Sequence, residues 1–375
     1  MRQPLYIRSA TAISPQQTFR REDFLQPVLS NDTGKLYALE APYSQYISPV
    51  AIRRMSRILK MTISTAMQCL KEAGVTTPDA ILTGTGRGSV TDMEQFVKDM
   101  IRLDEAAMNP TLFIQSTYNS PNGWIAMQSA CTGYNQTYVH RGCSFELALQ
   151  DAQMMMAESE NPLSVLAGCY DEMTEEYYLI RGKRDYWKTE SFRSMNLFDH
   201  GFTAGTIGGE GSAFFMLSNE AAMSQAVITD LSIIYRATRE ALLQSVMQLL
   251  ASWGMHPEDI SVVLTGLNGD VLQSSLYEEA LGAFPADTCI AGFKHLCGEY
   301  DTATGFAVWL ADHMIRQQYT LEVTLLRGIP PARIQHILII NHYIHGTASV
   351  MLLSHVMHSS TTRMLRPFNK QIVDG

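Results

Sequence analysis

The sequence predicts an α/β fold built from two halves of similar architecture. Helical and strand patterns of hydrophobic residues alternate along the 375 residues, and this alternation repeats after about residue 220. Hydrophobic residues make up 46% of the chain and charged residues only 17%, which supports a large core and a surface partly covered by another subunit. We therefore expect two related halves, residues 1–220 and 221–375.

The first half begins with a helical pattern over residues 51–74, in which Gly74 is suited to the C-terminal cap. The other elements expected in this half are a strand at 80–82, a glycine turn at 84–88, a helix at 91–103, a helix beginning near Ser144, a strand at 163–167 and a strand after 211. Residues 109–138 are polar, and we expect a long loop with a functional or interface role there. Residues 170–205 are interpreted as an insertion.

The second half repeats the alternation of the first. We expect strands at 226–235, 262–265, 289–291, 337–340 and 348–353, and helices at 239–253, 276–284 and 303–318.

Charge and apolar patterning exclude several classes of protein. The formal net charge is −9 and no long basic run offsets it, which argues against nucleic-acid binding. No run approaches the ~18 apolar residues of a spanning helix, and the start MRQPLYIRSA does not resemble a signal peptide, so we expect a cytoplasmic protein without a membrane span. The six cysteines lack metal-ligand spacing, and the turn at 84–88 lacks the Lys-Ser/Thr of a phosphate loop. Neither a metal nor a cofactor is predicted.

Seven groups of residues follow one another along the chain. They are Arg54 to Gly74, Gly84-Thr-Gly86, Gly142-Cys143-Ser144, Phe198-Asp199 with Gly209-Glu-Gly211, Asn268-Gly-Asp270, Lys294 to Glu299, and Asn341 to Gly346. In order and spacing they resemble the motifs of the β-ketoacyl-acyl carrier protein synthase family of the thiolase superfamily. The resemblance covers nearly the whole chain. It implies a thiolase-like five-layered αβαβα sandwich of two related halves, normally dimeric, that works with an acyl carrier protein and without a cofactor.

Cys143 stands at the start of a predicted helix, where free N–H groups and the helix dipole favour a thiolate. The resemblance implies that Cys143 is the nucleophile that accepts an acyl chain as a thioester. The alternative is a cysteine inherited at a site that has lost its activity.

The resemblance also implies two histidines that donate hydrogen bonds to the enolate of decarboxylative condensation, and both are absent. Asn268 replaces the first and still carries an amide donor. Glu299 replaces the second, and an ionised carboxylate can only accept. The family's lysine is retained as Lys294. We expect Lys294 and Glu299 to form a structural ion pair; the alternative is a catalytic role for both.

Two further features leave alternatives open. His345 replaces the phenylalanine that gates the family's acyl pocket, so it is a candidate base for Cys143 or a structural residue of a turn. Arg53, Arg54 and Arg57 form a basic helix face, which implies either docking of an acidic acyl carrier protein or a solvated surface.

Loss of both histidines favours a chain length factor-type partner of an active ketosynthase, in fatty acid, polyketide or aryl polyene biosynthesis (a flexirubin-type pathway is a further likeness). The alternative is an acyltransferase or condensing enzyme that uses Cys143, and a third is an acyl-binding homodimer without turnover. Ordinary decarboxylative condensation by this chain alone is not expected.

Overall fold

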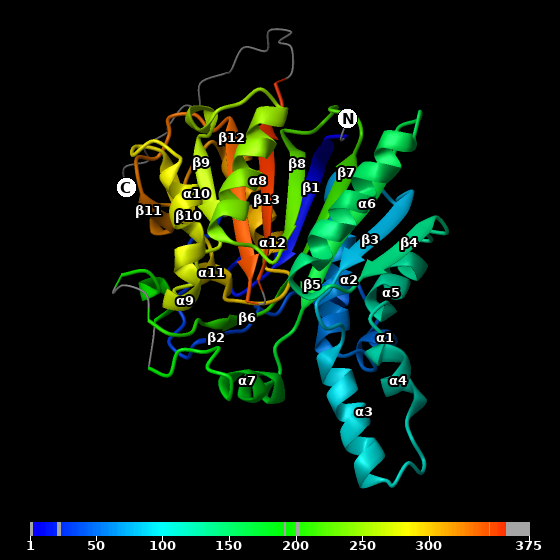
Figure 1. Ribbon diagram of the computed structural model, residues 1–375. Helices are drawn as coiled ribbons and strands as arrows, with labels where there is room; N and C mark the ends of the chain where they lie inside the picture. The colour runs from blue at the N-terminus through cyan, green and yellow to red at the C-terminus, as the bar shows by residue number, and fades with distance from the viewer. Residues whose placement is uncertain (1–2, 21–23, 191–192, 200–202, 345, 358–375) are drawn as a thin grey trace, which may run out of the picture.

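The computed structural model describes residues 3–20, 24–190, 193–199, 203–344 and 346–357. Within these residues, eleven strands form one mixed sheet in the order β11-β10-β9-β12-β13-β8-β1-β7-β5-β3-β4 (Figure 1). They are β1 (Leu5–Ile13), β3 (Ala80–Gly84), β4 (Tyr134–Tyr138), β5 (Ser164–Asp171), β7 (Gly211–Ser218), β8 (Ala226–Tyr235), β9 (Val262–Thr265), β10 (Cys289–Gly292), β11 (Leu325–Arg327), β12 (His336–Tyr343) and β13 (Thr347–His355). A separate ladder pairs β2 (Lys35–Leu36) with β6 (Gly208–Gly209).

Strand pairing follows the same pattern on both sides of the central β1–β8 pair. On one side β1 pairs antiparallel with β7, β7 antiparallel with β5, and β5, β3 and β4 are parallel. On the other side β8 pairs antiparallel with β13, β13 antiparallel with β12, and β12, β9 and β10 are parallel. Strand β11 adds an antiparallel edge to the second half. The repeat expected from the alternating pattern is present as a repeated topology.

The helices lie in layers on either side of these strands. They are α1 (Pro49–Ile52), α2 (Arg57–Ala73), α3 (Val90–Arg102), α4 (Pro110–Ser116), α5 (Ser120–Gln128), α6 (Ser144–Glu158), α7 (Glu175–Gly182), α8 (Arg239–Ser252), α9 (Val271–Ser274), α10 (Glu278–Gly282), α11 (Lys294–Cys297) and α12 (Thr304–Gln317). Helices α6 and α12 share a central core with strands of both halves, whereas α2 and α8 each pack on an outer core.

Alternate residues along the strands face different cores, as strand geometry requires. In β3, Leu82 faces the central core and Ile81 faces the core under α2. In β9, Leu264 faces the central core and Val263 faces the core under α8. The two parts of the eleven-stranded sheet therefore lie on either side of α6 and α12, and α2 and α8 cover their outer faces. The order of layers is helix, sheet, helix, sheet, helix, which confirms the predicted five-layered αβαβα sandwich.

Two predictions about local structure were wrong. The helix expected over residues 51–74 is interrupted at Arg53–Ser56, and Ser56 is the N-cap of α2; Gly74 does end it, with a φ of 68°. The loop expected over 109–138 contains α4, α5 and β4. Asn109 accepts a hydrogen bond from the N–H of Thr111 and Pro110 is the first helical residue of α4, a start signal that the polar composition concealed.

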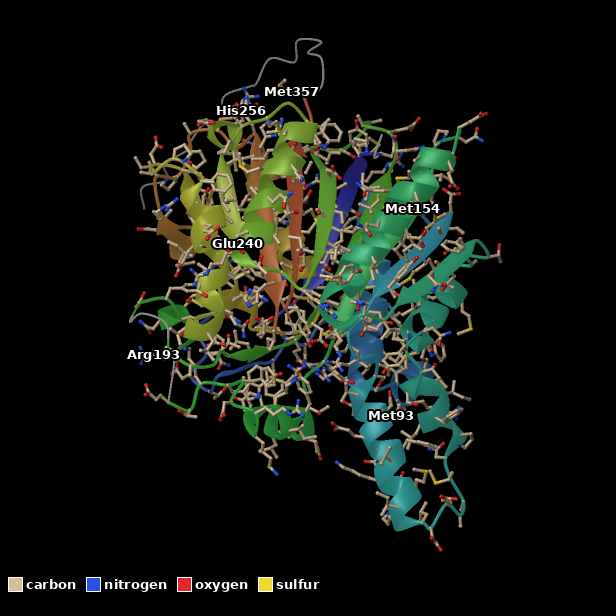
Figure 2. The ribbon with its side chains drawn as sticks, in the orientation of Figure 1. Met93, Met154, Arg193, Glu240, His256 and Met357 are labelled. Atoms are coloured by element: carbon tan, nitrogen blue, oxygen red, sulfur yellow. The ribbon has the colours of Figure 1, made fainter. Side chains whose placement is uncertain are left out.

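Helices α3 and α4 extend away from the layered body (Figure 1). Several of their exposed side chains are apolar: Met93, labelled in Figure 2, Ile101 and Phe113 are 43%, 77% and 57% exposed. Exposed apolar groups of this size on a projecting element are typical of a protein–protein contact. Among the described residues, no helix has both the length and the apolar character to cross a bilayer.

Candidate functional site

Cys143 lies at the end of a tight turn, Arg141–Cys143, directly before α6. The turn is strained, because Arg141 has a φ of 50°. The Ser144 hydroxyl lies 2.8 Å from the carbonyl oxygen of Thr85 and accepts the N–H of His140 at 2.8 Å. These contacts fix the start of α6 against the end of β3 and hold Cys143 in the central layer.

The Cys143 thiol is buried and protonated. Its side chain is 1% exposed, and burial, reinforced by the nearby charge of Glu146, raises its pKa to about 12. The expectation that the helix start favours a thiolate was therefore wrong, since desolvation outweighs the dipole here. Glu146 is itself wholly buried: its Oε1 accepts from Ser349 at 2.8 Å, and burial raises its pKa.

We predict that Cys143 reacts slowly with iodoacetamide at neutral pH. With a pKa near 12, roughly 10⁻⁵ of the thiol is ionised at pH 7, against a few per cent for a free cysteine, so ionisation alone slows alkylation about 10³-fold. The rate should rise about tenfold per pH unit between pH 7 and 10. Peptide mass spectrometry after timed alkylation measures it, with glutathione as the reference thiol. A rate close to that of glutathione at pH 7 would contradict the buried, neutral thiol.

Lys294, Glu299 and Asn268 form a buried chain of charge-assisted contacts. Lys294 Nζ lies 2.7 Å from Glu299 Oε1, and the two side chains are 0% and 2% exposed. Asn268 Nδ2 donates to Glu299 Oε2 at 3.0 Å. The predicted Lys294–Glu299 ion pair is thus present, and both positions that lack histidine are joined to each other. The Glu299 carboxylate thus accepts hydrogen bonds from both Lys294 and Asn268, the two donors that remain at the family's catalytic positions.

His342 makes hydrogen-bond contacts through both ring nitrogens, which the sequence did not predict. Its Nδ1 contacts the hydroxyl of Tyr277 at 2.5 Å, and its Nε2 contacts Gln273 Oε1. Burial, with the nearby Lys294 charge, lowers the pKa of His342 to about 3. Tyr277 remains protonated, because burial raises its pKa. A neutral ring with both nitrogens engaged acts as a structural link rather than a base. His345 lies outside the described residues.

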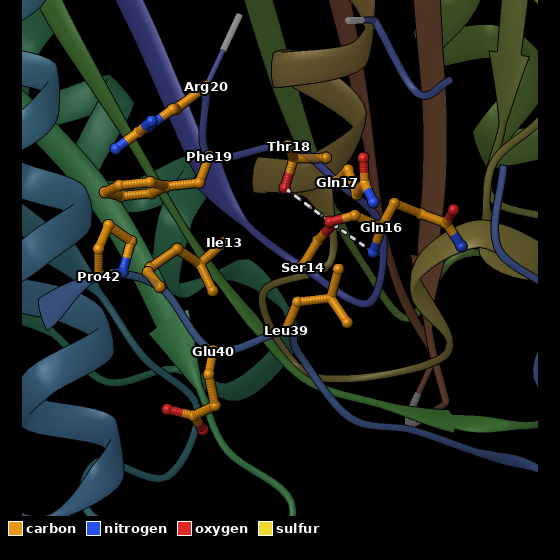
Figure 3. A pocket seen from close by; sticks show the side chains of 11 residues that line it. Ile13, Ser14, Gln16, Gln17, Thr18, Phe19, Arg20, Leu39, Glu40 and Pro42 are labelled. Atoms are coloured by element: carbon orange, nitrogen blue, oxygen red, sulfur yellow. Dashed lines mark hydrogen bonds between the residues drawn. The ribbon is translucent and has the colours of Figure 1, made fainter. Parts of the chain in front are cut away.

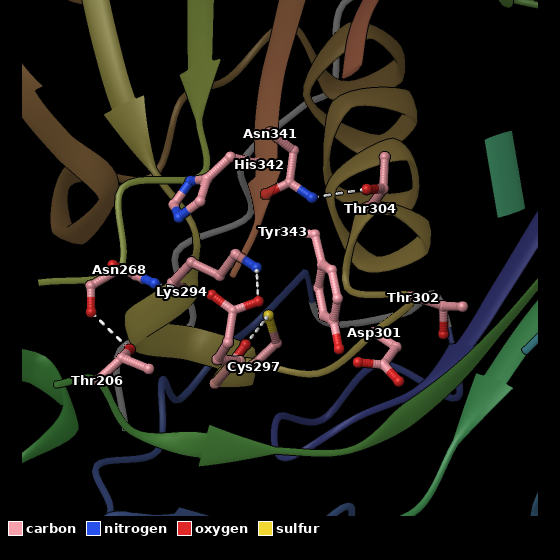
Figure 4. A network of polar contacts seen from close by, with 12 residues as sticks. Thr206, Asn268, Lys294, Cys297, Asp301, Thr302, Thr304, Asn341, His342 and Tyr343 are labelled. Carbon is pink, nitrogen blue, oxygen red and sulfur yellow. Dashed lines mark hydrogen bonds and ion pairs between the residues drawn. The ribbon is translucent and has the colours of Figure 1, made fainter. Parts of the chain in front are cut away.

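A cleft of about 440 Å³ opens beside this network and includes His342, Tyr343, Gln273 and Arg239 in its lining. Figure 4 shows Lys294 and His342 on one side of the Tyr343 ring, and Asp301 beside its hydroxyl end. Cys143 does not line the cleft. A second pocket, of about 300 Å³ (Figure 3), is formed by the end of β1 and following residues and contains none of the predicted site residues.

The three arginines predicted to form one basic face do not share one helix. Arg53 and Arg54 are exposed in the turn between α1 and α2. Arg57 begins α2 and is held by two carboxylates, at 2.7 Å from Glu40 and 2.5 Å from the buried Glu210. Any docking role is therefore confined to Arg53 and Arg54.

Sequence reasoning missed several polar residues that make contacts at the site. They are Glu146 and Tyr343, which lie beside Cys143 and Gly142, and Arg87, Arg181, Gln273, Tyr277 and Asp301, which contact Tyr343, His342 or one another. Glu146 carried a signal, since this carboxylate stands three residues after Cys143 between the apolar residues Phe145 and Leu147. The others lie on different segments that only the fold brings together. In the described part of the chain, no group of three His, Cys, Asp or Glu side chains is placed to hold a metal ion.

Comparison with known proteins gives one family match and several similar folds. Residues 30–192 match the family described as beta-ketoacyl synthase, N-terminal domain. No curated protein sequence matches. A beta-ketoacyl synthase from Burkholderia phymatum STM815 has a TM-score of 0.77 at 14% identity, over 95% of this chain and 100% of that one.

Two of the similar structures are described as ketosynthases with a chain length factor. The ishigamide ketosynthase/chain length factor has a TM-score of 0.76 at 15% identity, over 95% of this chain and 100% of that one. The ketosynthase ApeO in complex with its chain length factor ApeC, from Xenorhabdus doucetiae, has a TM-score of 0.73 at 12% identity, over 94% and 98%. At these identities the likeness is one of fold.

Proposed function

We propose that this protein is a chain length factor-type partner of an active ketosynthase, because residues 30–192 match the beta-ketoacyl synthase N-terminal domain family and the chain is similar in fold to a beta-ketoacyl synthase. It pairs with a related chain that carries out the condensation, in fatty acid, polyketide or aryl polyene biosynthesis. Similar structures described as complexes of a ketosynthase with a chain length factor support this choice of partner.

The observation that carries the proposal is the position of the Glu299 carboxylate. It accepts from Asn268 at 3.0 Å and from Lys294 at 2.7 Å, so these donors are satisfied within the protein. Decarboxylative condensation requires donors directed at the oxygen that becomes negative in the transition state. A buried carboxylate at this place accepts such donors and would repel the developing charge. The neutral Cys143 thiol further disfavours acylation.

Strand β4 offers the proposed partner surface. It is an edge of the sheet and pairs only with β3 among the described residues. Its sequence, Tyr134 to Tyr138, contains no charge and no proline, and Tyr134, Asn135 and Gln136 are exposed. An uncharged, unpaired strand edge of this kind can pair with another strand. The exposed Phe113 and Ile114 on α4, 57% and 62% exposed, add apolar surface to the same half.

We expect this chain to form a stable one-to-one heterodimer when co-expressed with a ketosynthase that retains its cysteine and two histidines and is encoded beside it. Affinity purification through a tag on one chain, followed by light scattering on the eluted peak, measures the stoichiometry. Glutamate at both Tyr134 and Gln136 should abolish the complex, because charges on a pairing edge oppose strand addition. Tyr319→Glu is the matched control, since Tyr319 is 47% exposed and Tyr134 is 48% exposed. A homodimer alone, with no retention of the ketosynthase, would refute the proposal.

The acyltransferase alternative is separated by intact-mass spectrometry of this chain after incubation with acyl-acyl carrier protein. We expect no mass increase. An adduct that is lost in Cys143→Ala would establish Cys143 as an acyl acceptor and favour the alternative.

In the proposed pair, the acyl carrier protein docks on the complex, and Arg53 and Arg54 of this chain are the basic contacts. A similar structure is described as an acyl-carrier protein in complex with its ketosynthase.

A further inference from the structure

The ring of Tyr343 fills the space next to Cys143. A Cβ atom placed on Gly142, the residue before Cys143, would lie 2.2 Å from both Cβ and Cγ of Tyr343. Glycine at 142 therefore allows the aromatic ring to lie directly on the turn that carries the thiol. Tyr343 itself is 4% exposed and stands at the end of β12. Access to Cys143 from this side depends on where the Tyr343 ring lies.

Arg181 holds the far end of that ring. Its Nη2 donates to the Tyr343 hydroxyl at 2.9 Å and lies 3.9 Å from Asp301 Oδ1. Its guanidinium also lies over the ring of Tyr186, with 4.6 Å to the ring centre. Arg181 comes from α7, and its side chain is 7% exposed. A buried guanidinium with a hydroxyl, a carboxylate and an aromatic face around it is firmly placed.

A second arginine completes the cluster. Arg87 Nε lies 3.1 Å from Asp301 Oδ2, and its guanidinium lies 4.4 Å from the centre of the Tyr177 ring. Asp301 in turn packs on Gly86, where an added Cβ would meet its carboxylate at 2.1 Å. The cluster joins α7, the turn after β3 and the segment before α12. Its charges and rings are unsuited to surround an apolar acyl chain, because such a chain would desolvate them without replacing their contacts.

We propose that Arg181 closes Cys143 by locking Tyr343 against Gly142, so that the thiol is shut off by the protein's own side chains. Closure is local: it involves α7 and the end of β12 and leaves the sheet intact. Leu179 and Ile180, which precede Arg181 on α7, are 61% and 65% exposed, so movement of this helix would disturb few packed groups on its outer side. This closure is independent of partner binding, and its failure would leave the proposed function standing.

The test is the rate at which iodoacetamide alkylates Cys143 at pH 9, followed by peptide mass spectrometry. Arg181→Ala should raise that rate about tenfold or more, because the ring loses the group that fixes it. The other cysteines, Cys69, Cys131, Cys169, Cys289 and Cys297, are also buried and report on general unfolding in the same sample. Arg184→Ala, at an exposed position just beyond α7, is the control and should leave the rate unchanged.

Tyr343→Phe keeps the ring and removes only its hydroxyl, and it is the second variant should Arg181→Ala unfold. It should give a smaller rise that is again confined to Cys143. A selective rise at Cys143 in either variant supports the closure. The absence of a selective rise in folded Arg181→Ala, or in folded Tyr343→Phe where Arg181→Ala unfolds, would overturn it.

Discussion

Lys294→Met is expected to destabilise the protein by about 3–5 kcal/mol, which is the usual cost of leaving one member of a buried ion pair without its partner. Lys294 is 0% exposed and contacts Glu299 at 2.7 Å. After the substitution, the amide of Asn268 is the one side-chain donor left to Glu299 among the described residues.

Urea unfolding followed by circular dichroism measures the change in the free energy of unfolding. The matched variant is the double substitution of Lys294 and Glu299 by methionine, which removes both charges. It should restore most of the lost stability, because an apolar pair of similar volume can replace a buried ion pair. A loss under about 1 kcal/mol in Lys294→Met would show that Glu299 is not held as an ion in the folded protein.

Gly84→Ala is expected to cost about 3 kcal/mol or more and to displace the start of α6. A Cβ at position 84 would lie 2.4 Å from the backbone nitrogen of Phe145 and 2.5 Å from the carbonyl oxygen of Ser144. These are backbone atoms of the first turn of α6, and they cannot rotate away as a flexible side chain would. The helix that carries Cys143 at its start must therefore shift as a whole.

Thermal unfolding by calorimetry measures this effect, with Gly123→Ala as the control. Gly123 lies inside α5, and an added Cβ meets nothing within 4 Å. Alanine there should leave stability unchanged or raise it by up to about 1 kcal/mol, because alanine favours helix over glycine. Equal melting temperatures for Gly84→Ala and the wild type would contradict the close approach of β3 to α6.

Elements with a complete local signal could be predicted from the sequence. Strand β8 has the bounds expected for it, and α2 ends at Gly74 as its cap predicts. The break before α2 was missed because apolar residues continue through Arg53–Ser56 at helical spacing. In α4, Asn109 and Pro110 were a helix start that the polar surroundings outweighed. Local patterns therefore predicted most elements. The predictions were wrong where the composition of a segment and its capping residues pointed to different structures.

At the site, the sequence predicted which residues lie together better than it predicted their protonation states. The Lys294–Glu299 ion pair, expected from the retained lysine and the glutamate that replaces a histidine, is present. The protonation of Cys143 could not be predicted, because it depends on burial within the fold and on Glu146. The same holds for Arg181 and Tyr343, which are 162 positions apart in sequence and meet only in the folded chain.

Helix α12 couples the folding of the two repeated halves, because residues of both halves bury it. Twelve of its residues, Thr304 to Ile315, are buried, and Trp309 at its centre is 1% exposed. Its neighbours in the central core come from both halves, including Phe215 of the first and Ile339 of the second. Neither half can bury this helix alone, so the unfolding of one removes the support of the other. We therefore expect the two halves to unfold in one cooperative transition rather than as two domains in succession.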